Sequence, residues 1–399
     1  MIEIQQNKTG QNKTGGKVIA SGGFGCIFQP ALKCKTRKNN TNDKRRISKL
    51  MTKKHAKSEY KEIVSFQSTL KKIPNYEDYF LLNDFTLCKP NNLTKSDLQD
   101  YKKKCKALNK KNITVKNVNK SLNKLLSLNM PYGGVDLKHI IKEKSYSYSF
   151  SKLNQGLIRL LRNGIVPMNN LGVYHCDIKE GNILIKNEGK YEMYMRLIDW
   201  GLSCKYNEKD NKRTIPKILT NRPFQYNVPF SIIFFNKIFI KEYHKFLKEK
   251  EKNKKVEPTY FDIREFVVNY ISLWIKIRGP GHLKSMNEKM AKLVYTSLKN
   301  VEKKEINNVI IYDFTYYYII EYLSKILETF TKNGKFLIHE YFSTVFIKNI
   351  DIWGFVMTYF AFFNKKTNNK IKQMIIHFLF KNPCKPIDVE QLLEQLENL

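Results

Sequence analysis

The stretch GVYHCDIKEGNILI concentrates side chains that can do chemistry, because it places Asp177, Lys179 and Asn182 between two short apolar runs. A further carboxylate, Asp199, begins an Asp-Trp-Gly motif after the next apolar segment. In phosphoryl transfer a carboxylate orients an attacking hydroxyl, a cation offsets charge on the moving phosphoryl group, and oxygen ligands hold Mg²⁺. We therefore predict that Asp177 and Lys179 are catalytic and that Asn182 and Asp199 bind metal. The alternative is an ordinary polar turn.

The flanking segments are expected to position these groups by forming a β-hairpin. Apolar residues 183–185 are followed by the turn signal KNEGK and by a second strand, EMYMRLI, which ends just before Asp199. Because a hairpin brings its two ends together, Asp199 is expected to lie near Asp177 and Asn182.

The order of these groups resembles the protein kinase family, whose catalytic loop reads HRDxKxxN and whose metal motif reads Asp-Phe-Gly. The chain has HCDIKEGN at 175–182 and DWG at 199–201. The resemblance implies ATP as the phosphate donor, Mg²⁺ or Mn²⁺ as the metal, and protein hydroxyls as acceptors. Lys179, two residues after the catalytic aspartate, is similar to the serine/threonine-specific members.

The glycine cluster IASGGFGCIF predicts a strand, a turn and a strand, and by itself such a turn indicates only a hairpin. Upstream of the catalytic loop it resembles the kinase loop GxGxxGxV, with Gly22 and Gly25 at the second and third glycine positions and Ala20 at the first. The resemblance assigns ATP binding to consecutive residues: Ile19, Ala20, Ser21, Gly22, Gly23, Phe24, Gly25, Cys26 and Ile27.

A lysine and a glutamate that hold ATP also follow from the resemblance. Lys49, in the expected strand RRISKLM, would bind the α- and β-phosphates. A glutamate of the helix expected over 56–70 would pair with this lysine. We prefer Glu62 to Glu59, because Glu62 lies nearer the end of that helix.

The segment 128–132 resembles the kinase hinge, an extended backbone that offers an amide and a carbonyl to the adenine edge. Met130 and Tyr132 are the residues expected to make these contacts. The alternative is a strand that leads into a glycine turn and has no role in binding.

Two positions concern how the catalytic loop is held. Asp351, in NIDIWGFVMTYFAFF, resembles the kinase aspartate whose carboxylate holds the backbone of the catalytic loop from beneath. Cys176 replaces the arginine of HRD, which in the family receives an activation-loop phosphate. We therefore expect a non-RD enzyme that is active without phosphorylation of its activation loop.

The interval between Asp199 and Asp351 is far longer than an activation segment needs. RPFQYNVPFS, residues 222–231, would replace the usual Ala-Pro-Glu anchor, and a helical insertion is expected at about 207–345. Its aromatic residues are expected in a packed core rather than on a surface that stacks bases. The Asn- and Lys-rich insertions, the Asp-Trp-Gly motif and RPFQYN together resemble serine/threonine kinases of giant nucleocytoplasmic DNA viruses.

The predicted fold class is α+β, a two-lobed protein-kinase-like fold with a small antiparallel-sheet lobe and a larger helical lobe. We expect a flexible tail over 1–16 and a sheet lobe over 17–129, with a charged, solvated insertion at about 89–122. The helical lobe, with its long insertion, is expected over 130–399.

The chain is strongly basic, with 71 Lys and Arg against 36 Asp and Glu and a formal charge of +35. Such charge attracts nucleic acid and acidic or virion proteins, although the codon bias of an AT-rich genome is the explanation that we prefer. Seven scattered cysteines without a CxxC pair predict a reduced, cytoplasmic location, or a virion, and no structural zinc. No apolar run approaches the ~20 residues of a membrane span.

Three functions follow as hypotheses. The first is an ATP-dependent serine/threonine protein kinase. The second is a catalytically silent kinase fold that acts as a basic nucleic-acid-binding or virion scaffold, which so complete a catalytic set disfavours. The third is phosphotransfer to a small molecule, for which Lys179 gives less reason.

Overall fold

A computed structural model of the chain describes residues 17–35, 45–143, 148–188, 192–207, 214–254, 257–295, 311–363 and 368–399. These residues form two compact units, the first from 17–68 and 81–133 and the second from 69–80 and 134–399. The units differ from the predicted lobes in two short segments, because 69–80 groups with the second unit and 130–133 with the first. The predicted tail at 1–16 lies outside the described residues.

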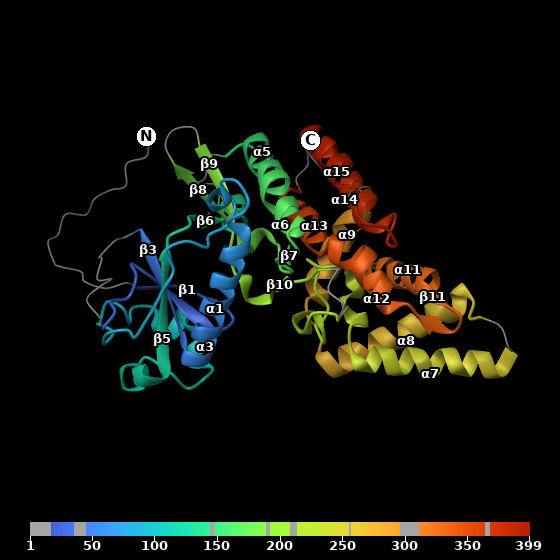
Figure 1. Cartoon of the computed structure of the whole chain (residues 1–399), viewed down its shortest axis with the longest axis horizontal. Helices are drawn as coiled ribbons and strands as arrows, with labels where there is room; N and C mark the ends of the chain where they lie inside the picture. Colours follow the sequence, from blue (N-terminus) through green and yellow to red (C-terminus); the bar gives the residue numbers. More distant parts are fainter. Residues whose placement is uncertain are drawn as a thin grey trace. The chain divides into compact units, whose positions relative to one another are not determined.

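The first unit is built on a five-stranded antiparallel sheet with the strand order β1-β2-β3-β5-β4 (Figure 1). Its strands are β1 (Lys17–Ser21), β2 (Gly25–Gln29), β3 (Arg46–Thr52), β4 (Thr86–Cys88) and β5 (Leu125–Pro131). The prediction of a strand, a turn and a strand around the glycine cluster is confirmed. The strand expected over YFLLNDFTLC is shorter than predicted, because Asp84 adopts a left-handed backbone (φ 54°) that extended chain does not allow.

Helix α1 (Lys53–Leu70) follows β3 without a connecting loop. The predicted helix is confirmed, and it buries Ala56, Ile63, Phe66 and Leu70, which recur at helical spacing. The helix begins three residues earlier than expected, and this start decides which glutamate can meet the lysine of β3.

The charged insertion at 89–122 is packed against the sheet through its apolar side chains, while most of its lysines are exposed, so the prediction of a solvated segment holds only for its charged residues. It contains α2 (Tyr101–Lys104) and α3 (Lys106–Asn109), with a short 3₁₀ turn at Asn119–Lys124. Apolar residues that its many lysines and asparagines separate in sequence come together against the sheet: Leu93, Tyr101, Cys105, Leu108, Ile113, Val118 and Leu122. The polar composition of the insertion therefore did not reveal its packing, because a few well-spaced apolar side chains are enough to attach the segment to the sheet.

Two disulfides contradict the expectation that all cysteines are reduced. Cys26 is bonded to Cys105, and Cys34 to Cys88. The partners are 79 and 54 residues apart, so no local spacing could have indicated either pair. Cys176, Cys204 and Cys384 are free.

The second unit is mainly helical, with two small antiparallel sheets beside the catalytic loop (Figure 1). One sheet joins β6 (Val135–Asp136), β8 (Ile183–Glu188) and β9 (Glu192–Leu197), and the other joins β7 (Val173–Tyr174) to β10 (Cys204–Lys205). Strands β8 and β9 are the predicted hairpin. The surrounding helices are α4 (Leu137–Lys142), α5 (Phe150–Leu160), α6 (Val166–Asn170), α13 (Ile347–Thr358), α14 (Asn368–Ile375) and α15 (Val389–Glu397).

The described part of the predicted helical insertion is a packed helical layer. It contains α7 (Lys237–Lys254), α8 (Tyr260–Arg278), α9 (Leu283–Tyr295) and α11 (Ile311–Phe330), then the hairpin β11 (Thr331–Lys332) and β12 (Lys335–Phe336), and α12 (Ile338–Tyr341). Helices α7 and α8 lie side by side (Figure 1). Their facing aromatic residues Phe239, Tyr243, Tyr270 and Trp274 are buried, which confirms a core role. Residues 296–310 lie outside the described chain.

Among the described residues, one helical run is long and apolar enough to cross a membrane by length and composition alone. It is Ile338–Phe362, with 25 residues and a mean hydropathy of 1.3. The sequence shows no unbroken apolar run of this length, because polar residues such as Lys348 and Asn349 interrupt it. Of its most apolar window, 89% is buried inside the protein, as in a core helix.

Candidate active site

The catalytic loop lies between β7 and β8 and is held by a carboxylate of α13. Asp351 Oδ2 accepts from the backbone N–H of His175 at 2.8 Å, and Oδ1 accepts from that of Cys176 at 2.7 Å. The predicted role of Asp351 is therefore confirmed. Cys176 has a left-handed backbone (φ 59°), which is uncommon for a residue with a side chain, and Asp351 holds it in that conformation.

Helix α13 contacts the loop with two further residues. A Cβ at Gly354 would lie 2.6 Å from the Ile178 carbonyl oxygen and 2.9 Å from that of Asn227, so only glycine allows the helix so close. Trp353 Nε1 donates to the Tyr226 carbonyl at 2.9 Å. One turn of one helix thus fixes both the catalytic loop and the segment 222–231.

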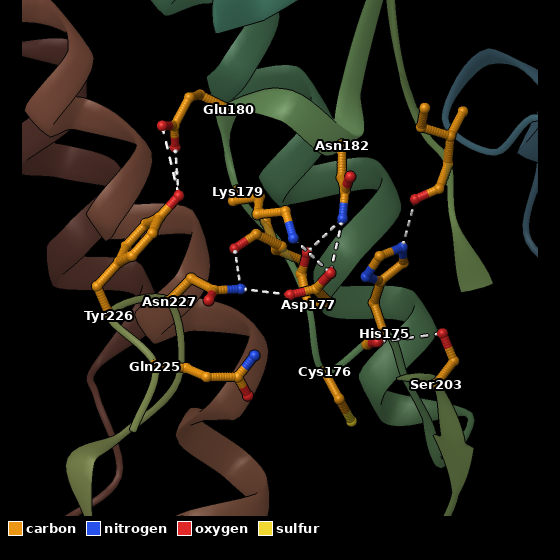
Figure 2. Close-up of polar contacts among 12 residues, drawn as sticks. His175, Cys176, Asp177, Lys179, Glu180, Asn182, Ser203, Gln225, Tyr226 and Asn227 are labelled. Atoms are coloured by element: carbon orange, nitrogen blue, oxygen red, sulfur yellow. Dashed lines mark hydrogen bonds and ion pairs between the residues drawn. The ribbon is translucent and has the colours of Figure 1, made fainter. Parts of the chain in front are cut away.

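Asp177 receives donors on both carboxylate oxygens (Figure 2). Oδ2 accepts from Lys179 Nζ at 2.7 Å and from Asn182 Nδ2 at 3.0 Å, and Oδ1 accepts from Asn227 Nδ2 at 2.8 Å. Burial raises the pKa of Asp177, but the charge of Lys179 and the hydrogen bonds from Lys179 and Asn227 outweigh it, so the pKa is lowered overall. The carboxylate is therefore ionised and fixed in direction.

Lys179 and Asn182 both contact Asp177, and each still has an atom that can contact another group. The Lys179 side chain is 26% exposed against 6% for Asp177, so its ammonium group borders solvent while it contacts the carboxylate. Asn182 Nδ2 donates to both the side chain and the backbone carbonyl of Asp177. Its Oδ1 is therefore the atom that is left to bind a metal ion.

Asp199 lies at the end of the hairpin, as predicted. The backbone N–H of Ile198 donates to the Asn182 carbonyl at 3.1 Å, which joins the start of β8 to the residue before Asp199. Asp199 is exposed and has a left-handed backbone (φ 66°). The hairpin thus brings the two predicted metal ligands to the same end of the sheet.

The donor chemistry fits Mg²⁺. In the described chain, no three His, Cys, Asp or Glu side chains cluster to form a metal cage. Mg²⁺ is normally held by one or two protein oxygens together with waters and substrate phosphates. The Asn182 amide oxygen and the Asp199 carboxylate are hard donors of this kind, so these two residues are the ones that would hold the ion.

His175 supports the loop from inside. It is buried, its Nε2 donates to the Ile198 carbonyl at 3.0 Å, and its ring meets that of Trp200 edge to face at 4.9 Å. Burial lowers the pKa of His175, so the ring is neutral. It therefore positions the backbone before Asp199 rather than transferring protons.

The segment 222–231 is more closely joined to the catalytic loop than its sequence suggested. Arg222 is buried, donates from Nη1 to the Cys176 carbonyl at 3.0 Å and donates from Nε to Gln225 Oε1 at 2.6 Å. Asn227, which sequence reasoning missed, donates to Asp177. The two contacts span 46 and 50 residues, and no local pattern marks Arg222 or Asn227 as a partner of the loop.

Cys176 occupies the position of the family's arginine and has a packing role. Its Sγ lies 3.7 Å from Cys204 Sγ, and both side chains are buried. Burial raises the pKa of Cys176, so the thiol is protonated and unreactive. An arginine still reaches this loop, but it is Arg222 and it comes from a different segment.

In the first unit, Lys49 pairs with Glu59 rather than with Glu62. Lys49 Nζ lies 2.7 and 2.8 Å from the two carboxylate oxygens of Glu59. The Glu62 carboxylate accepts instead from Ser58 Oγ at 2.9 Å. The preference for Glu62 is therefore wrong: α1 starts directly after β3, so its earlier turns lie beside Lys49.

The glycine-rich turn lies next to the same lysine. The N–H of Gly22 donates to the Gly25 carbonyl at 3.0 Å and closes the turn between β1 and β2. A Cβ at Gly22 would lie 3.7 Å from Lys49 Cε, so this part of the turn borders the ammonium side chain. A Cβ at Gly25 would lie 2.6 Å from the Leu50 carbonyl oxygen, which explains the glycine there.

The hinge prediction needs one correction. The N–H of Tyr132 donates to the Arg45 carbonyl at 2.6 Å, so this amide is already used within the first unit. Pro131 has no N–H to offer. A role for Met130 and Tyr132 in binding adenine stays a prediction. The Tyr132 amide is not the donor in that role, because it already donates to Arg45.

Comparison with known proteins supports the family resemblance. The model of the protein kinase domain family matches residues 99–219, which include the catalytic loop and Asp199. The match begins after Lys49 and the glycine-rich turn, and it covers less than half of the chain. No curated protein matches the chain. Together with the antiparallel sheet and the helical second unit, the match confirms the predicted α+β, protein-kinase-like fold.

Removal of the Asn227 amide should misdirect Asp177. We expect Asn227→Ala to lower the rate of phosphotransfer, the reaction predicted from the sequence, by about 10- to 100-fold, the worth of a hydrogen bond to a charged group. The acidic limb of the rate profile should move to higher pH, because the bond that lowers the pKa of Asp177 is lost. Thr220→Ala is the control, since the Thr220 hydroxyl donates only to the Lys217 carbonyl of its own turn. Equal rates and profiles in both variants would contradict this role.

Asp351 should make stability depend on pH. Burial raises its pKa from 3.8 to about 7, although the two backbone N–H groups partly oppose the shift. Between pH 4 and 7 the folded protein therefore holds a proton that the unfolded chain has lost, so stability falls as pH rises. We expect the free energy of unfolding of the wild type, relative to Asp351→Asn, to decrease over this range. Urea unfolding at several pH values measures the difference, and parallel curves would disprove the shift.

Proposed function

We propose that the chain is an ATP-dependent protein kinase that transfers the γ-phosphate to serine and threonine hydroxyls with Mg²⁺ or Mn²⁺. The observation that carries the proposal is the set of three donors that fix Asp177. They belong to Lys179, Asn182 and Asn227, and they leave an ionised carboxylate in one orientation. A polar turn without function would not need a buried, directed charge of this kind.

In this proposal each residue of the second unit has one task. Asp177 orients the acceptor hydroxyl and accepts its proton, for which an ionised carboxylate is required. The ammonium group of Lys179, which borders solvent, offsets charge on the transferred phosphoryl group. Asn182 Oδ1 and Asp199 would hold Mg²⁺, which when bound offsets charge on the ATP phosphates.

The groups of the first unit would bind the phosphates of ATP. Lys49 carries the charge, and Glu59 holds its ammonium group with both carboxylate oxygens. Gly22, beside Lys49, allows the backbone of the turn to approach phosphate closely. The proposal thus keeps the predicted lysine and exchanges its glutamate.

We further propose that activity does not require activation-loop phosphorylation. Arg222 and Asp351 already hold the backbone at Cys176 through buried bonds. No phosphate on the activation loop is needed to hold this part of the backbone. The serine/threonine preference rests on Lys179, and the relation to giant-virus kinases and the acidic partners remain proposals from the sequence. The cytoplasmic or virion location also remains a proposal, although the two disulfides contradict the reduced cysteines from which it was predicted.

The catalytic assignment is tested with labelled ATP, Mg²⁺ and a mixture of acidic and basic protein substrates. We expect phosphotransfer by the wild type and a loss of at least about 100-fold in Asp177→Asn, because the amide cannot accept the hydroxyl proton. Equal, near-zero transfer by both proteins would refute the kinase proposal and favour a silent scaffold. Comparison of serine, threonine and tyrosine peptides then reads the acceptor preference.

A pair of glutamate variants three residues apart tests the first unit in the same assay. Glu59→Gln should raise the KM for ATP, because Lys49 loses the charge that orients it. Glu62→Gln is the matched control, since Glu62 contacts Ser58 rather than Lys49. The reverse order of the two effects would contradict the pairing of Lys49 with Glu59.

A further inference from the structure

The hairpin that carries the glycine-rich turn is attached to the insertion at 89–122 through its first strand. The N–H of Ala107 donates to Ser21 Oγ at 3.1 Å, at the last residue of β1. The N–H of Val18 lies 3.4 Å from the Gln99 carbonyl oxygen and donates to it. Both partners lie in the insertion, around α2 and α3.

The second strand of the hairpin is attached covalently. Cys26, the residue after Gly25, is bonded to Cys105, which lies between α2 and α3. Both cysteines are fully buried. The insertion therefore holds the hairpin on each side of the turn, at Ser21 and at Cys26.

Packing reinforces these links on one face of the sheet. Val18, Cys26 and Phe28 form a buried cluster with residues of the insertion, and the rings of Phe28 and Tyr101 lie 6.4 Å apart. Side chains alternate along a strand, so Ile27, which is paired with Lys49 in the sheet register, points to the other face. The insertion thus covers one face, and Lys49 lies on the other, where it pairs with Glu59 of α1.

The tip of the turn is exposed at Gly22, Gly23 and Phe24. Phe24, 48% exposed, stacks on His55 of α1. Glycine-rich segments lose more conformational freedom on ordering than others, which makes a fixed base valuable for a loop of this composition. The base of the loop is held, while its phosphate-facing tip stays accessible.

We propose that the insertion at 89–122 is a clamp that sets the position of the glycine-rich loop before ATP binds. The inference rests on the proposed function, since it names how the phosphate-binding loop is positioned. Cys105, Ala107 and Gln99 are its positioning residues. None of them is among the predicted ATP contacts, and they act through Cys26, Ser21 and Val18.

Cys105→Ala tests the clamp, and Cys88→Ala is its matched control, because it breaks the other disulfide of the same unit. We expect Cys105→Ala to raise the KM for ATP about three- to tenfold with kcat within about twofold, since the loop must now be ordered by the nucleotide. Without nucleotide, the amides of 18–28 should exchange hydrogen faster than in the wild type. Cys88→Ala should change neither quantity. A purely structural role predicts similar losses of stability in both variants and no difference in KM or exchange, which would overturn the proposal.

Ser21→Ala provides a second test that keeps both disulfides, in case Cys105→Ala does not fold. It removes the acceptor of the Ala107 bond, so the amides of Ala107 and of 18–28 should exchange faster. The KM for ATP is not the readout for this variant, because Ser21 is itself a predicted ATP contact and its hydroxyl also donates to the Gly25 carbonyl at 3.3 Å. Wild-type exchange in this variant would overturn the clamp. Absence of phosphotransfer in the wild type would contradict the proposed function instead, and the exchange comparison, made without nucleotide, would still decide the clamp.

Discussion

The catalytic loop depends on a buried carboxylate that accepts two backbone hydrogen bonds. Asp351 holds the N–H groups of His175 and Cys176, and so fixes the left-handed residue that directs Asp177 toward its donors. The arrangement is costly, because burial opposes ionisation of the group that must accept these bonds. Burial of this carboxylate fixes the orientation of the catalytic loop but lowers the stability of the folded protein.

The same turn of α13 also sets the second half of the site. Trp353 and Gly354 bring 222–231 against the helix, and this segment supplies Asn227 to Asp177 and Arg222 to the Cys176 carbonyl. The catalytic geometry therefore comes from two segments far apart in sequence, the catalytic loop and 222–231, which meet on one helix. Its precision depends on close packing, which allows no side chain at Gly354.

The parts of the site that are local in sequence were predictable, and the parts that join distant segments were not. Asp177, Lys179 and Asn182 lie within one short loop whose spacing indicates their chemistry, and the hairpin signal placed Asp199 nearby. Glu59 was the alternative that we did not prefer, because nearness to the end of the helix favoured Glu62, whereas the earlier turn of α1 lies beside Lys49. Asn227 and the bond between Cys26 and Cys105 were missed because sequence separations of 50 and 79 residues carry no periodic signal.

The bond between Arg222 and Cys176 joins the catalytic loop to the segment 222–231. To part them, a buried guanidinium would have to lose its carbonyl partner, which costs far more than the displacement of a solvent-exposed loop. For the kinase that we propose, this bond predicts that the segment 222–231 stays against the catalytic loop whether or not the enzyme carries a phosphate.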